Sequence, residues 1–209
     1  MSCQPKIAKR LRQPIKAAPF VDTWRNKQLE YSFRRGLMNK YADFSVCTEN
    51  ALEFCCNFYK IELSSSQKAA LMNEYTILPA FPDVETGLKK LKEAGHTLIA
   101  FSNGSAKAIS KLLVNAKIMD SFDGIVSVED VKMFKPSHLV YEHFNKKTNS
   151  AKSDSWLISS NPFDVIGAIS YGMRSVWIQR SKDSVFDPWG IDPTATIKDI
   201  SELALKLKQ

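Results

Sequence analysis

Polar side chains follow two apolar segments of the sequence in a way that could bind an anion. Ser102 and Asn103 come at the end of the apolar run 97–102 and precede a predicted helix, where hydroxyls and free backbone N–H groups can receive negative charge. Lys135 stands before Pro136, and proline disfavours the helical conformation for the residue before it, so this ammonium group can point across the strand ends. Alone, either feature could be an ordinary turn or a solvated lysine.

A third group follows the apolar run 156–160. Ser159, Asn161 and Asp164 place a hydroxyl, an amide and a carboxylate within six positions, with Phe163 among them. Asp164 could also serve only as a first-turn carboxylate that favours the helix dipole. In an open parallel sheet, however, ligands bind beyond the carboxyl ends of the strands. The order of the three groups therefore predicts one site for a small anion.

The elements that must position these groups alternate between strand and helix after Pro79. Asp83 is predicted to cap a helix that Gly95 ends, and Pro136 is predicted to open a later helix. Alternation of this length predicts right-handed βαβ units and a parallel sheet. The predicted strands are 97–102, 124–128, 156–160 and 175–178, and the other predicted helices are 105–116 and 161–171.

Residues 24–82 have a helical pattern with no convincing strand, which predicts a helical cap subdomain. Asp22 and Thr23 are expected to cap a first helix that begins at Trp24. A second helix is expected from about residue 45, and the spacing of Ser64 and Gln67 predicts a capping box for a third.

Residues 1–23 form a basic leader, which we expect to be disordered. The net charge of the 209 residues is +7, but residues 1–40 hold ten basic and two acidic residues, so the remainder is close to neutral. Ile7, Leu11 and Ile15 recur every four residues beside basic ones, as in an organelle transit segment.

Composition excludes several classes of protein. With 44% hydrophobic and 24% charged residues the chain is globular, and no stretch approaches the roughly 20 apolar residues of a membrane span. The four cysteines show no C-x-x-C pattern, so neither a disulfide framework nor a metal site is expected, and a cytoplasmic location is the default. The leader has one aromatic residue, Phe20, and the body is neutral, which argues against nucleic-acid binding.

Five stretches closely resemble the L-2-haloacid dehalogenases of the haloacid dehalogenase superfamily. The resemblance runs from about residue 24 to the C-terminus, and the two cap stretches and the SSN-x-x-D run distinguish this branch from the phosphatases of the superfamily. In order, they are WRNKQLEY at 24–31, LMNKYADF at 37–44, FSNGS at 101–105, KPSHLVY at 135–141 and SSNPFDVIGA at 159–168.

The resemblance implies an α/β protein with a Rossmann-like parallel sheet core over 83–209 and the helical cap over 24–82. It implies that an aspartate attacks C2 of a short 2-haloacid, expels halide and forms an ester that water hydrolyses. No cofactor or metal is implied; the partner is a small 2-haloacid or other small carboxylate, and a homodimer is possible. The resemblance implies that Ser102 and Asn103 bind the substrate carboxylate and that Lys135 orients the nucleophile. It implies that Arg25 and Asn161 bind the halide, while Phe44 and Phe163 form an apolar wall. Ser159, Tyr141 and Asp164 match positions that support the lysine and the water.

The sequence departs from this family at the nucleophile. The expected first motif is a central apolar strand that ends in Asp-x-x-Gly-Thr, yet Asp22 is the only aspartate among residues 1–23 and lacks the Gly-Thr that should follow. Without that strand we expect a gap of about 10 Å in the sheet, two unpaired strand edges, and a stability below that of an intact relative.

Three explanations stay open for the missing motif. In the first, which we favour, the start is incorrect or an upstream segment is fused, and the real protein has the missing strand and is an ordinary dehalogenase. In the second, the chain is an inactive homologue that only binds small carboxylates. In the third explanation the basic leader is functional and directs the protein to an organelle or to nucleic acid.

Overall fold

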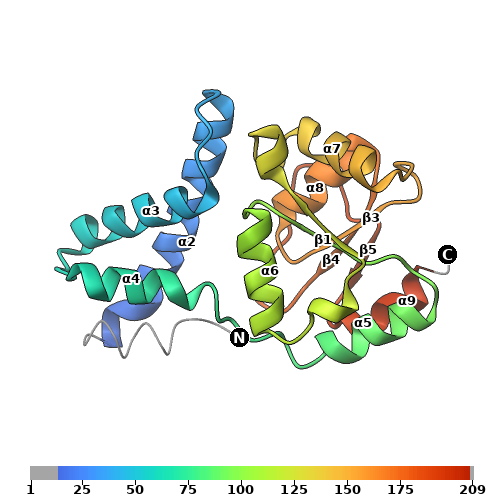
Figure 1. Cartoon of the computed structure of the whole chain (residues 1–209), viewed down its shortest axis with the longest axis horizontal. Coiled ribbons are helices and arrows are strands. Elements are labelled where there is room, and N and C mark those ends of the chain that lie inside the picture. The colour runs from blue at the N-terminus through green and yellow to red at the C-terminus, as the bar shows by residue number, and fades with distance from the viewer. Residues whose placement is uncertain (1–13, 208–209) are drawn as a thin grey trace.

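Three helices form the cap in the computed structural model, which describes residues 14–207 (Figure 1). They are α2 (Pro14–Leu37), α3 (Phe44–Tyr59) and α4 (Ser65–Glu74). The cap has its own apolar core, in which Trp24, Leu52 and Leu71 are fully buried. The capping box predicted for Ser64 and Gln67 is confirmed at the start of α4, because each side chain bonds the backbone of the other residue.

The predicted start of the first cap helix is wrong. Helix α2 begins at Pro14, so residues 14–23 are helical and Asp22 and Thr23 lie inside the helix instead of capping it. The physical reason is packing: Phe20 lies one helical turn before Trp24, and both side chains are fully buried in the same cap core. A proline is well tolerated in the first turn of a helix, where its missing N–H would have no partner. The rest of the leader, including Ile7 and Leu11, lies outside the described residues.

The core contains five parallel strands with helices between them. One predicted helix start is wrong: α7 begins at His138 with Ser137 at its N-cap, not at Pro136. Asp83 is at the N-cap of α5, as predicted, although its side chain makes no capping hydrogen bond there. Strand β5, near the C-terminus, is not predicted from the sequence. In chain order the core elements are α5 (Val84–Glu93), β1 (Ile99–Ser102), α6 (Ala106–Asn115), η1 (Met119–Ser121), β2 (Gly124–Ser127), η2 (Val128–Val131), α7 (His138–Thr148), β3 (Trp156–Ser159), α8 (Pro162–Tyr171), β4 (Arg174–Ile178), β5 (Ala195–Ile197), η3 (Ile200–Glu202) and α9 (Leu203–Lys206).

The five strands form two separate sheets. One sheet pairs β1 with β2, and the other has the order β3-β4-β5, with every pairing parallel. Within the described residues, β1 and β3 are therefore edge strands that do not pair with each other, as expected if a strand between them is missing. Burial shows the consequence: Ser175–Ile178 of β4 are all buried, whereas all four residues of β1 are only half-buried.

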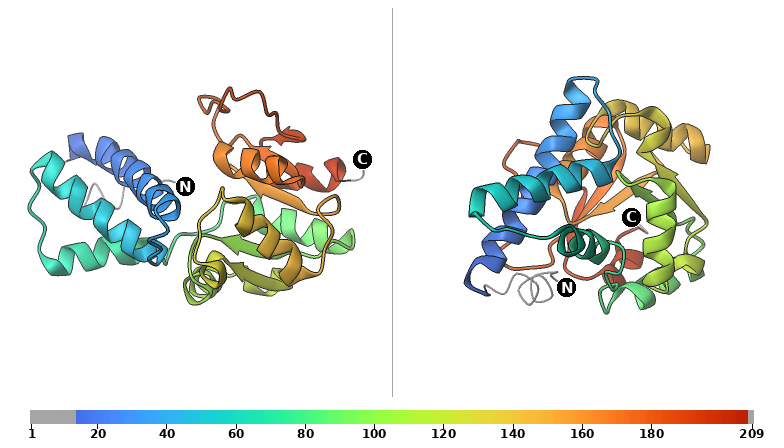
Figure 2. Two further views of the ribbon diagram at one scale, coloured as in Figure 1. Left: turned by 90° about the horizontal axis from the view of Figure 1, so that it is seen from above. Right: turned by 60° about the vertical axis from the view of Figure 1, so that its left-hand side comes forward.

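The two sheets nevertheless lie side by side under shared helices. Phe101 of β1 and Leu157 of β3 belong to one apolar cluster with Tyr141 of α7, and Leu98 and Ile158 belong to another with Leu91 of α5. Both clusters thus combine residues from the two sheets, one cluster on each face. Figure 2 shows the cap as a helical body beside this α/β core.

Candidate functional site

A buried ion pair lies at the carboxyl ends of β1 and β3. Lys135, in the segment between η2 and α7, places its Nζ 3.1 Å from Oδ1 and 3.3 Å from Oδ2 of Asp164, in the first turn of α8. Each of the two side chains is only 7% exposed. The Ser159 hydroxyl, at the end of β3, donates to Asp164 Oδ2 over 3.1 Å, and Lys135 Nζ also donates to the Phe101 carbonyl of β1 over 3.4 Å. The ammonium group is thereby held between the ends of the two edge strands.

Tyr141 supports this pair from α7. Its hydroxyl donates to the backbone carbonyl of Asp164 over 3.2 Å, and its side chain is fully buried. Burial, and then the nearby negative charge of Asp164, raise the pKa of Tyr141 well above its ordinary value, so the phenol stays neutral. Tyr141 therefore fixes the backbone that carries Asp164 and adds no charge to the site.

The segment after β1 is held by its own hydrogen bonds. Ser102 Oγ accepts from Gly104 N over 3.1 Å, and Asn103 Oδ1 accepts from Lys135 N over 3.0 Å. Asn103 is 7% exposed, so its amide fixes the backbone that presents the lysine ammonium. The segment is a turn in which Asn103 contacts Lys135 and Ser102 contacts Gly104.

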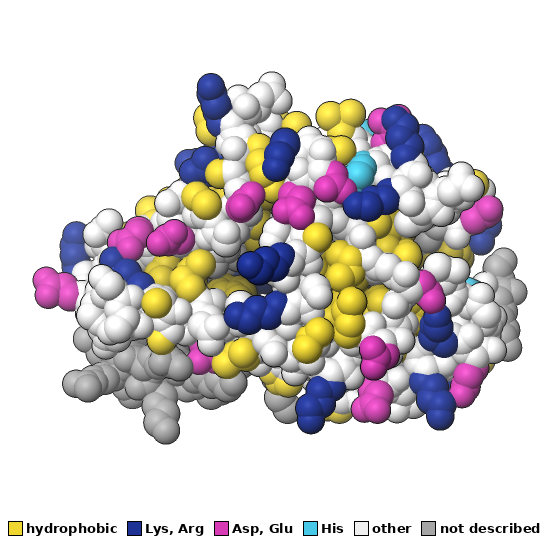
Figure 3. Space-filling view, viewed as in Figure 1, with side chains coloured by type: hydrophobic (Ala, Val, Ile, Leu, Met, Phe, Trp, Pro, Cys, Tyr) yellow, Lys and Arg dark blue, Asp and Glu magenta, His cyan; other side chains and the backbone are white. Residues whose placement is uncertain are grey.

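A second group of predicted residues joins the cap to the core. The Arg25 guanidinium, on α2, donates to Asn161 Oδ1 over 2.7 Å, and Asn161 N donates to Ser159 Oγ over 3.1 Å. Ser159 thus links the Arg25–Asn161 contact to the buried ion pair. Phe163 meets the Phe33 ring of α2 edge-on, with centroids 5.2 Å apart. Hydrophobic side chains gather along this boundary between cap and core, with lysine and arginine side chains over them (Figure 3).

Phe44 packs beside Phe134, the residue before Lys135. The centroids of the two rings are 6.0 Å apart, and Phe44 belongs to a cluster that includes Cys47 and Val140. Sequence reasoning missed Phe33 and Phe134. Phe33 belongs to the apolar side of a predicted cap helix, which gives no indication that it contacts the core. Phe134 lies in a turn for which the sequence contains no periodic pattern.

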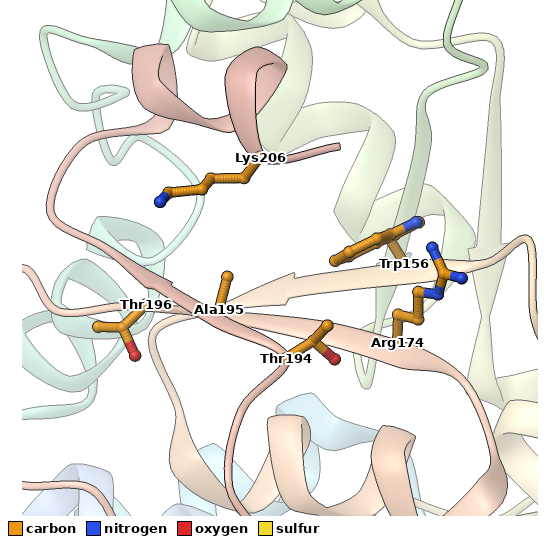
Figure 4. A pocket seen from close by; sticks show the side chains of 6 residues that line it. All are labelled: Trp156, Arg174, Thr194, Ala195, Thr196 and Lys206. Atoms are coloured by element: carbon orange, nitrogen blue, oxygen red, sulfur yellow. The ribbon is translucent and has the colours of Figure 1, made fainter. Parts of the chain in front are cut away.

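Two cavities of the described residues are not lined by Lys135 or Asp164. One, of about 530 Å³, is lined by Trp156 and Arg174, the first residues of β3 and β4, with Lys206 above them (Figure 4). The site is therefore defined by its chemistry and not by cavity size.

Among residues 14–207, no cluster of three or more His, Cys, Asp or Glu side chains could hold a metal ion. Over the same residues, no helix has both the length and the apolar character needed to cross a membrane.

The family is decided by comparison with known proteins. Residues 37–178 match the family model described as haloacid dehalogenase-like hydrolase. The chain belongs to this family. Among the relatives of this haloacid dehalogenase-like chain, the (S)-2-haloacid dehalogenase 2 of Pseudomonas sp. (strain CBS-3) is 36% identical over 180 residues, which are 86% of this chain and 78% of the relative. The haloacetate dehalogenase H-2 of Moraxella sp. (strain B) is 35% identical over 184 residues, 88% of this chain and 82% of the relative.

Solved structures agree with this family assignment. The haloacid dehalogenase-like fold of this chain is similar to the L-2-haloacid dehalogenase from Xanthobacter autotrophicus with chloropropionic acid covalently bound, with a TM-score of 0.90 and 26% identity. That match covers 99% of this chain and 93% of the other. The α/β class with a helical cap, expected from the sequence, is confirmed, and the family is one of hydrolases.

Proposed function

We propose that the strand-end site is a 2-haloacid dehalogenase site of which the 209-residue chain supplies the binding and charge-stabilising groups but not the attacking carboxylate. The observation that carries this proposal is the buried Lys135 ammonium, held by Asp164 and the Phe101 carbonyl where two edge strands end. A buried cation at this place favours the ionised form of a carboxylate that approaches it.

The reaction of such a site has two steps. A carboxylate oxygen attacks C2 of the 2-haloacid, and the carbon–halogen bond breaks with its electron pair leaving on the halide, so an ester forms. Water then attacks the ester carbonyl, which releases the 2-hydroxyacid and a proton and regenerates the carboxylate. In this proposal Arg25 and Asn161 stabilise the departing halide, Ser102 and Asn103 bind the substrate carboxylate, and Phe44 and Phe163 exclude water.

The chain offers no good candidate for the attacker. Residues 1–21 contain neither aspartate nor glutamate. Asp22 lies within α2, in the cap helix that buries Phe20 and Trp24, and Asp164 is already engaged by Lys135 and Ser159. We therefore expect the chain to bind short 2-haloacids without turnover, as a carboxylate-binding member of the family.

Ligand-induced stabilisation tests the binding site. L-2-Chloropropionate should raise the Tm of the chain, because a ligand that binds only the folded state stabilises it. Arg25→Ala should weaken the affinity by about ten-fold or more, the effect of losing one charge-assisted hydrogen bond. Arg34→Ala is the matched control, because Arg34 lies on the same helix and pairs with Glu30 on the surface. Equal affinities for the two variants would contradict the proposed site.

A further inference from the structure

The cavity of about 530 Å³ lies at the amino ends of β3 and β4, away from the carboxyl ends that carry Lys135. Its position is given by Trp156 and Arg174, which are the first residues of the two strands and are partners in the register of the sheet. Ser159, which contacts the buried ion pair, is the last residue of β3, roughly 10 Å from Trp156 along an extended strand. The cavity is therefore separate from the proposed haloacid site, and an inference about it is independent of the proposed function.

The charged side chains that line this cavity are cations. Arg174 and Lys206 both line it and both are exposed, whereas no aspartate or glutamate among residues 14–207 is part of its wall. Within the same residues, neither Arg174 nor Lys206 forms an ion pair with a carboxylate. A cavity wall with two such cations attracts an anion, and an anion with two negative charges matches its charge.

Arg174 is held in place by its neighbours. Its guanidinium lies over the Trp156 ring, 5.2 Å from the centroid, and its backbone N donates to the Ser155 carbonyl over 3.1 Å. A guanidinium that packs on an aromatic ring keeps its N–H groups available, and this planar fork bonds two oxygens of a phosphate or carboxylate. Because the side chain is positioned in advance, less conformational entropy is lost when an anion binds.

The rest of the wall is apolar. Trp156, which is half-buried, and Ala195 pack against the same apolar cluster of the core. The Ala195 methyl group points to the side of the sheet that Lys206 covers, whereas Thr194 and Thr196 point to the other side (Figure 4). A volume of about 530 Å³ lies within the range of roughly 300–1,000 Å³ for sites of small organic molecules, so a bare anion would leave most of the cavity empty.

We propose that this cavity binds a small phosphate monoester that carries a planar ring, the chemistry of a nucleoside monophosphate. A phosphate monoester carries about −1.5 to −2 charges at neutral pH, which balances Arg174 and Lys206 together. The ring of the ligand packs against Trp156 and Ala195, since every nucleobase has a flat face that an aromatic side chain can contact. A carboxylate on the same ring carries a single negative charge and leaves one of the two cations without a partner.

The test measures binding of adenosine monophosphate (AMP) to the 209-residue chain by titration calorimetry in metal-free buffer. AMP should bind one to one and at least ten-fold more tightly than adenosine or inorganic phosphate, because it alone contacts both the cations and the apolar wall. No binding of AMP would overturn the site. Adenosine that binds as tightly as AMP would overturn the role of the cations, and inorganic phosphate that binds as tightly would overturn the role of the apolar wall.

Two substitutions test the cations directly. Arg174→Gln and Lys206→Gln should each weaken AMP binding by about ten-fold, the effect of losing one charge-assisted hydrogen bond. Both side chains are exposed, so the Tm of either variant should stay close to that of the parent chain. Lys198→Gln is the matched control, because Lys198 is an exposed lysine just after β5 that does not line the cavity. Equal affinity of AMP for all three variants would overturn the assignment of the phosphate.

Two further variants locate the ring and the site. Trp156→Leu retains an apolar side chain at the cluster and should reduce the affinity for AMP to that for inorganic phosphate, while phosphate binding stays unchanged. Undiminished AMP binding by this variant would overturn the contact with Trp156. Arg25→Ala, at the carboxyl ends of the strands, should bind AMP as the parent chain does. Weaker binding of AMP by Arg25→Ala would place the ligand at the Lys135 end and overturn the inference.

Discussion

Lys135 and Asp164 are the residues on which the site depends most. Both are almost completely buried, and Lys135 Nζ bonds the Asp164 carboxylate and the Phe101 carbonyl. Replacing one member of a buried ion pair leaves an uncompensated charge, so Lys135→Met should lower the free energy of unfolding by about 3–5 kcal/mol. Adding Asp164→Asn should recover most of this loss, because no buried charge then remains. Urea denaturation of both variants measures the difference, and additive losses in the double variant would contradict the coupling.

Sequence reasoning predicted where Ser102, Ser159 and Asp164 lie in the fold, because they lie at or after the ends of apolar runs. Ser102 and Ser159 end β1 and β3, and Asp164 lies in the first turn of α8, as the alternation of strand and helix predicts. It placed the start of α7 incorrectly because Ser137 N bonds Phe134 O, which forms a turn that delays the helix to His138. The residue pattern alone could not predict the contact between Arg25 and Asn161, which are 136 positions apart; only the family resemblance brought them together, through an implied shared role in halide binding.

Helix α2 is the element that sequence reasoning described least well. Its prolines and basic residues indicated a leader, whereas Phe20 proves to be a fully buried part of the cap. Phe20→Ala should therefore lower the free energy of unfolding by about 3–5 kcal/mol, as for other buried phenylalanines. Phe58→Ala is the matched control on α3: Phe58 is 62% exposed, so its loss should change stability by no more than about 0.5 kcal/mol. Equal effects, measured by urea unfolding, would contradict the assignment of Phe20 to the cap core.

The residue pattern of the sequence predicts neither strand β5 nor the division of the strands into two sheets. Ala195–Ile197 is three residues long, too short for an alternation to be recognised, and is defined only by its pairing with β4. The unpaired edges of β1 and β3 could be expected only from the resemblance to a family in which a strand lies between them.

At the scale of the whole molecule, Asp83 connects three distant parts of the core. Its carboxylate, on the segment that leads from the cap into α5, accepts bonds from Arg180 after β4 and from Ile200 N in η3. Burial opposes its ionisation, but the hydrogen bonds from Ile200 N and Arg180 outweigh this effect and lower the pKa of Asp83. Its contribution to stability is therefore complete above the unfolded-state pKa of about 4 and is lost as the pH falls through the lower folded-state value.

Removing the Asp83 carboxylate should change how the free energy of unfolding depends on pH under acidic conditions. Asp83→Asn should lower the free energy of unfolding at pH 7 by about 1–3 kcal/mol and flatten its decline below about pH 4. Thermal unfolding between neutral and acidic pH measures both effects. Asp154→Asn, at an exposed position, should leave the profile of the parent chain unchanged. An Asp83→Asn profile parallel to that of the parent chain would show that this carboxylate does not contribute.

For the whole molecule, we propose a haloacid site whose attacking group is not among the 209 residues. The most direct measurement follows chloride in solution while purified 209-residue chain, stabilised by L-2-chloropropionate, is incubated with that substrate. The account predicts a raised Tm and no chloride above the buffer control. Sustained chloride release from this chain alone would contradict it, because an attacking carboxylate would then be present within these residues.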